Sequence, residues 1–211
     1  MNLRVNLSVH RALRGETTYL WERFGMLIKI SNWMTRVSRG WVALLGLVIF
    51  ALFTALVLPR QAQNATPVAD VGTPDLSLWY SPSELYQMAE DYGAEGRQDY
   101  IQARLSFDVI WPLVYTSFLV TSLSWLFGRS TTLERLWRRA NLIPLAAMLL
   151  DFLENISTSI VMARYPAYSA GIAAVAPFFT LTKWLFVGGS FVLLLMGAGA
   201  LIRQRFSKPP C

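Results

Sequence analysis

An apolar stretch of the chain, AAMLLDFLENISTSIV at residues 146–161, carries four polar side chains that could do chemistry. Asp151, Glu154, Asn155 and Thr158 follow an i, i+3, i+4, i+7 spacing, which places them on one face of a helix. Two carboxylates one helical turn apart repel each other when both are ionised, and a carboxyl group that keeps its proton can act as an acid. The stripe is therefore either a functional site or a set of contacts that fixes how helices pack.

A lysine in a second apolar stretch is the expected partner of these acids. Lys183 lies within residues 177–202. A charged side chain at the centre of a membrane helix costs about 2.5–3.5 kcal/mol on insertion scales, so it should face other helices rather than lipid. We therefore expect an ion pair between Lys183 and either Glu154 or Asp151.

A third apolar stretch, residues 107–128, adds Asp108 near its outer end and Tyr115 two turns deeper. Pro112 lies between them and removes one helical hydrogen bond, so a kink is expected there. These polar groups should lie at about the same depth in the membrane as the stripe that contains Asp151 and Glu154. The predicted binding residues are Asp108, Tyr115, Asp151, Glu154, Asn155, Thr158 and Lys183.

The residue types exclude several kinds of catalytic centre. His10 is the only histidine and Cys211 the only cysteine, so zinc, haem, iron–sulfur and Ser-His-Asp sites lack their parts. If the site is catalytic, Asp151 or Glu154 would serve as acid or base, and Lys183 would stabilise developing negative charge. Two acids and an amide could hold Ca²⁺ or Mg²⁺, but the nearby lysine argues against it. We expect no metal and no cofactor.

Four apolar runs are long enough to cross a bilayer, since about 20 residues span its hydrocarbon as a helix. They cover residues 41–59, 107–128, 141–163 and 177–202. Across the chain, 54% of residues are hydrophobic and 15% are charged, against about 25% charged in an average soluble domain. The predicted fold class is all-α: a polytopic membrane protein with a bundle of four transmembrane helices.

Charged residues outside these runs are unevenly distributed. Basic side chains dominate residues 1–40, the loop 129–140 and the tail 203–211, whereas residues 60–106 hold seven acids and three arginines. The positive-inside rule places both termini on the cytoplasmic side of a cell membrane and residues 60–106 on the outer side. The net charge of +6 therefore indicates asymmetry across a membrane, and no nucleic-acid partner is expected.

Two segments connect the helices on the outer side. Residues 60–106 should contain a helical hairpin, because Ser81 and Glu84 form a capping-box pattern and Gly93 can end the helix. Its second arm has helical spacing that continues into the next span. Residues 164–176 are assigned to an outer loop, although YSAGIAAVAPFF could instead begin the fourth helix early, interrupted by Pro177.

The segment 18–38 has the pattern of an amphipathic helix. Its apolar residues recur at spacings of three and four with basic residues among them: Leu20, Trp21, Phe24, Leu27, Ile28 and Met34. We expect this helix to lie on the inner membrane surface. The alternative is a cytoplasmic helix packed against the end of the bundle.

Three classes of function fit these patterns. The first is a small membrane protein that binds a lipid or hydrophobic ligand, or assembles with a membrane protein, through a buried polar pocket. The second is a small membrane enzyme that uses a buried carboxylate on a lipid-like substrate. The third is a proton-coupled carrier, which would have to act as a homo-oligomer, and the absence of visible inverted repeats counts against it.

Overall fold

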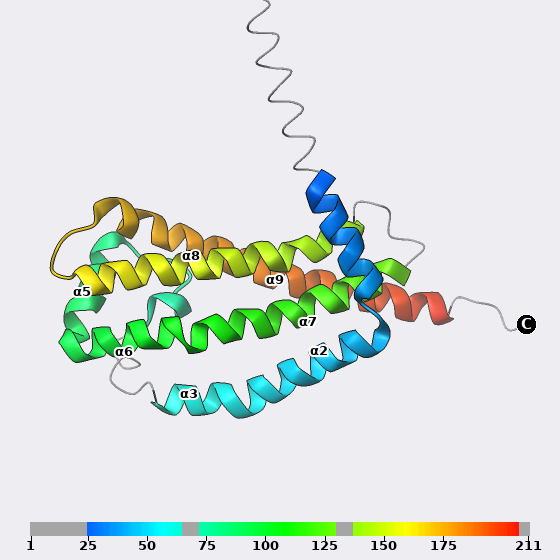
Figure 1. Cartoon of the computed structure of the whole chain (residues 1–211), viewed down its shortest axis with the longest axis horizontal. Helices are drawn as coiled ribbons and strands as arrows, with labels where there is room; N and C mark the ends of the chain where they lie inside the picture. Colours follow the sequence, from blue (N-terminus) through cyan, green and yellow to red (C-terminus); the bar gives the residue numbers. More distant parts are fainter. Residues whose placement is uncertain (1–24, 65–71, 130–136, 207–211) are drawn as a thin grey trace, which may run out of the picture.

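The structure is a computed structural model that describes residues 25–64, 72–129 and 137–206, and this part of the chain is helical with no strand. Four helices are long and apolar enough to cross a membrane: Gly40–Gln61, Gly93–Arg129, Arg139–Arg164 and Ala170–Gln204. The prediction of an all-helical chain with four such helices is confirmed. The helices lie side by side along one long axis (Figure 1).

The first long helix is the most loosely attached. It consists of α2 (Gly40–Leu52), a π-helical turn (η1, Phe53–Val57) and α3 (Leu58–Asn64). It packs mainly on α7 (Phe107–Arg129). Gly46 permits this contact, because a Cβ at that position would lie 3.0 Å from the Thr121 hydroxyl and 3.3 Å from the Phe118 Cα.

The hairpin α5–α6 covers one end of the bundle (Figure 1). α5 (Pro82–Asp91) begins with the predicted capping box between Ser81 and Glu84. The chain then turns through Gly93, whose φ of +63° suits glycine, into α6 (Gly93–Leu105). Its tyrosines and small residues pack against the ends of α8 (Ile143–Arg164) and α9 (Ala170–Phe206), in a cluster of Tyr80, Leu85, Ala89, Tyr92, Tyr100, Val161, Met162, Ala173 and Ala176.

The last helix is longer than the sequence predicts. α9 runs from Ala170 to Phe206, so it begins inside the segment 164–176 that was assigned to an outer loop. Pro177 does not end it: the proline removes one backbone hydrogen bond, and the helical residues before it are held by packing of Ala173 and Ala176 against the hairpin. The early, proline-interrupted start is the alternative that holds.

A helix at residues 25–37 crosses the other end of the bundle (Figure 1). Its Ser31 hydroxyl donates to Asn141 Oδ1 at 2.8 Å, and the Asn141 amide donates to Ser124 Oγ at 2.9 Å. On other faces Met26, Leu27, Ile30, Trp33 and Val37 are exposed. The helix thus packs on the bundle through one face and leaves apolar side chains uncovered. Residues 18–24 of the predicted amphipathic helix lie outside the described ranges.

Candidate functional site

Lys183 is the centre of a buried group of acids. Its side chain is 3% exposed, and its Nζ lies 2.5 Å from Glu154 Oε2 and 3.4 Å from Asp151 Oδ1. It also pairs with the Asp75 carboxylate. Both ion pairs that the sequence allowed as alternatives are present together, because α8 and α9 pack along most of their length.

Asp75 was not among the predicted site residues. It belongs to a segment that we call the strap, residues 72–80, which contacts α9 through its short helical turn and through Tyr80. A short 3-10 helix there (η2, Pro74–Leu76) brings Asp75 to the lysine, and the Trp184 indole donates to the Asp75 backbone carbonyl at 3.0 Å. The sequence signals only a turn at Pro74, and 108 residues separate Asp75 from Lys183. No local spacing links the two.

The ends of the strap are also anchored. The Tyr92 hydroxyl donates to the Gly72 carbonyl at 2.6 Å, and the hydroxyls of Tyr80 and Thr180 share a hydrogen bond of 3.1 Å. Burial raises the pKa of Tyr80 above its usual range, so this phenol stays protonated. Burial alone would raise the pKa of Asp75 too, but Lys183 and Arg104 outweigh it and hold that pKa below its usual value. Asp75 is therefore ionised at neutral pH.

A second cation, Arg104 on α6, connects the strap with α7. Its Nη1 lies 2.8 Å from Asp108 Oδ2 and 3.3 Å from Asp75 Oδ2. The backbone carbonyl of Asp108 lacks its helical donor, because Pro112 four residues later has no N–H. The Asn155 amide replaces that donor at 3.3 Å. The helical hydrogen bond that Pro112 removes is thus replaced by a contact that joins α7 and α8.

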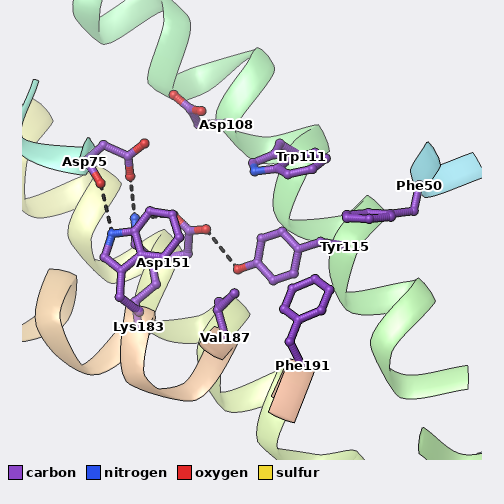
Figure 2. A pocket seen from close by; sticks show the side chains of 10 residues that line it. Phe50, Asp75, Asp108, Trp111, Tyr115, Asp151, Lys183, Val187 and Phe191 are labelled. Carbon is purple, nitrogen blue, oxygen red and sulfur yellow. Dashed lines mark hydrogen bonds and ion pairs between the residues drawn. The ribbon is translucent and has the colours of Figure 1, made fainter. Parts of the chain in front are cut away.

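A cavity of about 150 Å³ lies beside these charges, between α2, α7 and α9. Its lining residues are Phe50, Asp75, Asp108, Trp111, Tyr115, Asp151, Lys183, Trp184, Val187 and Phe191. Figure 2 shows the Asp75 and Asp151 carboxylates at one end and Phe50 and Phe191 at the other. Tyr115 lies between the two ends and donates to Asp151 Oδ2 at 2.9 Å. The cavity therefore has a charged end and an aromatic end.

Of the seven predicted binding residues, four line this cavity: Asp108, Tyr115, Asp151 and Lys183. Glu154 and Asn155 do not line the cavity but contact residues that do. Glu154 pairs with Lys183, and the Asn155 amide donates to the Asp108 carbonyl. Thr158 does neither, since its hydroxyl donates to the Glu154 and Asn155 carbonyls of its own helix. Sequence reasoning missed the aromatic wall, because Phe50, Trp111, Trp184 and Phe191 follow the same pattern as lipid-facing residues.

The charges of this site do not balance. We use the name charge cluster for the acids Asp75, Asp108, Asp151 and Glu154 together with the cations Arg104 and Lys183, which are joined by ion pairs of 3.4 Å or less. Four carboxyl groups face two cations, an excess of two acids. In a poorly solvated site this excess is held as bound protons or answered by another cation.

The cluster also has the donor set of a metal site. One carboxylate oxygen each from Asp75, Asp151 and Glu154 lies within 4.8 Å of the others. The Lys183 ammonium contacts all three acids, so it occupies the position that a bound cation would take. Lysine thus serves as the central cation of this group.

No protein-family model, curated protein or solved structure matches this chain. A functional conclusion therefore depends on the geometry of the cavity and the charge cluster.

Proposed function

We propose that this chain is an integral membrane protein that binds a lipid-like amphiphile in the cavity between α2, α7 and α9. The observation that carries the proposal is the polarity of the cavity, which runs from the carboxylates of Asp75 and Asp151 to the rings of Phe50 and Phe191. Membrane ligands combine a polar head with an apolar tail, and a cavity with two such ends matches both parts.

The surface of the long helices supports membrane insertion. Gly40–Gln61 and Ala170–Gln204 leave large apolar side chains uncovered, among them Leu44, Leu56, Leu185 and Leu195. An exposed apolar surface of this extent is unfavourable in water and favourable in hydrocarbon. The basic flanks at 1–40, 129–140 and 203–211 favour an arrangement with both termini in the cytoplasm and the α5–α6 hairpin outside.

This orientation gives the cavity a direction in the bilayer. Phe50 lies ten residues from Gly40, about 15 Å along the helix at 1.5 Å per residue, which is the middle of a 30 Å hydrocarbon layer. Asp108 lies 21 residues from Arg129, about 32 Å from the inner end, at the outer boundary. The charged end then faces the outer headgroups and the aromatic end faces mid-membrane. A lipid of the outer leaflet has the same direction, so it can enter without inverting.

The helix at residues 25–37 fits the inner interface in this arrangement. Its Ser31 and Met34 are buried against the bundle, and its exposed Trp33 is of the type that prefers the headgroup region. Lys29 and Arg36 are exposed as well and can meet anionic lipid. In this proposal both alternatives considered for the segment hold in part: the helix packs on the bundle and also touches the membrane.

Native mass spectrometry of the detergent-purified protein tests ligand binding. Val187→Trp places an indole inside the cavity, whereas Val192→Trp adds the same indole to the exposed side of α9, where Val192 is 56% exposed. Wild type and Val192→Trp should retain a lipid-like adduct that Val187→Trp loses at equal thermal stability. An adduct retained equally by all three proteins would place the ligand elsewhere, and a wild type that binds no added amphiphile would refute the proposal.

An enzymatic role is favoured by one contact at the cavity wall. Asp151 accepts a hydrogen bond from Tyr115 and pairs with Lys183, so a bound ligand would meet a carboxyl group linked to two proton donors. If the protein is an enzyme, Asp151→Asn should retain the ligand but leave its mass unchanged on incubation, while wild type converts it. A ligand whose mass is the same before and after incubation with wild type would contradict the enzymatic role and support binding without catalysis.

A further inference from the structure

We propose that the amphiphile bound in this cavity has a positively charged head group, such as an alkyl ammonium. This inference rests on the proposed function and names the chemical class of its ligand. It follows from the charges that face the cavity, from the atoms left without partners, and from the aromatic rings at the charged end.

The charge balance calls for a cation. Within the charge cluster the two cationic side chains leave an excess of two carboxyl groups. Three of the acids, Asp75, Asp108 and Asp151, line the cavity, but among the described residues Lys183 is the only cation that does. A ligand ammonium would reduce the excess, whereas a carboxylate or phosphate head would increase it.

Atoms of the cluster also lack partners. Asp108 Oδ2 pairs with Arg104, and the Asp108 side chain keeps 13% of its surface exposed. Glu154 is 1% exposed, and no hydrogen bond reaches its Oε1. A buried carboxylate oxygen without a donor, such as Glu154 Oε1, is costly. Asp108 is at the cavity wall, so a ligand N–H can reach it directly.

The cations of the site are already engaged. Lys183 contacts three carboxylates, and Arg104 pairs with Asp75 and Asp108. The Arg104 Nε is buried without a hydrogen-bond partner, but Arg104 does not line the cavity. Lys183, the cation at the cavity wall, is already paired with three acids and is not available to an anionic head group. This argues against a fatty acid or a phosphate monoester and separates the proposal from general amphiphile binding.

Aromatic rings complete the charged end. Trp111 and Tyr115 lie near the acids (Figure 2), and Trp184 lines the same cavity. Trp184 already has a cation above its ring, with Lys183 Nζ 5.2 Å from the ring centroid. Aromatic faces attract ammonium groups, most strongly where the cation is desolvated. Acids and aromatic rings together form the surface that recognises organic cations in proteins.

A series of ligands with one tail and three heads tests the inference. Dodecylammonium, dodecanol and dodecanoate are added to the full-length protein in a non-ionic maltoside at neutral pH, and binding is measured by native mass spectrometry. Wild type should bind dodecylammonium at least about tenfold more tightly than the other two, since a hydrogen bond to a charged group is worth about that factor. Asp108→Asn should lower dodecylammonium affinity about tenfold and leave dodecanol affinity unchanged.

Asp99→Asn is the matched control, because Asp99 is exposed on α6 away from the cavity and loses the same charge. If Asp108→Asn does not fold, Asp75→Asn replaces it, and the wild-type ranking of the three ligands is decisive alone. Dodecanol bound as tightly as dodecylammonium, or dodecanoate bound most tightly, would overturn the cationic head group while leaving amphiphile binding intact. Failure to bind any of the three would overturn the proposed function itself.

Discussion

Replacing Lys183 by methionine should destabilise this protein strongly, because the lysine is the common counter-ion of three carboxylates. Its side chain is 3% exposed and contacts Asp75, Asp151 and Glu154. Lys183→Met keeps the volume of the side chain but leaves the three acids facing one another. Removing one partner of a buried ion pair costs about 3–5 kcal/mol.

This free energy converts into a large thermal shift. In a chain of this size 1 kcal/mol moves the melting temperature by about 2–4 °C, so Lys183→Met should melt roughly 6–20 °C below wild type. The measurement is the loss of monodisperse protein on heating in maltoside, followed by size-exclusion chromatography. Lys29→Met is the matched control, because Lys29 is exposed on the helix 25–37 and should shift the melting temperature by no more than about 2 °C.

A second substitution separates the loss of charge from the loss of packing. Glu154→Gln alone should change stability little, because Lys183 keeps two acids. In the Lys183→Met background the same substitution should recover a large part of the lost melting temperature, since it removes one uncompensated carboxylate. A Lys183→Met protein that melts with wild type, or a double variant less stable than Lys183→Met, would refute this account of the cluster.

Three further predictions concern the strap, the helix contacts and the end of the bundle that the helix 25–37 crosses. Since the pKa of Asp75 lies below its ordinary 3.8, its ionised form stabilises the fold above that pH, and the melting-temperature advantage of wild type over Asp75→Asn should shrink as pH falls below it. Gly46→Ala should destabilise by about 1–3 kcal/mol through overpacking, whereas Gly188→Ala, with nothing within 4 Å of the new methyl group, should be neutral or stabilising in the same heating assay. Asn141→Leu should release the helix 25–37 and raise its amide hydrogen exchange, because Asn141 bonds that helix while fully buried; unchanged exchange would show that the helix is held by other contacts.

Local patterns in the sequence account for much of the bundle. The stripe from Asp151 to Thr158 depends on the periodicity of a single helix. Counting residues from the helix ends places Lys183 at the same level as this stripe, so the pairing of α8 with α9 could be anticipated. The capping box at Ser81 is likewise a local signal. These predictions succeed because the physical cause lies within a few residues of the effect.

Other parts of the site could not be found in this way. Asp75 reaches Lys183 across 108 residues, and a turn at Pro74 carries no information about what the next side chain will meet. The aromatic wall is invisible because Phe50 and Trp111 in an apolar helix resemble residues that face lipid. The early start of α9 depends on whether Pro177 ends a helix, and that is decided by packing of Ala173 and Ala176 against the hairpin.

The order of the charge cluster along the chain has a consequence for biogenesis. Asp75, Arg104 and Asp108 leave the ribosome first, then Asp151 and Glu154 on α8, and Lys183 follows on α9. Until α9 arrives, the two acids of α8 have no lysine to pair with. If the chain is inserted in a membrane as we propose, α8 should remain at the translocon and enter the bilayer together with α9. A chain that carries Lys183→Met should therefore be degraded by membrane quality control. Its cellular abundance should be lower than that of wild type whether or not a ligand is present.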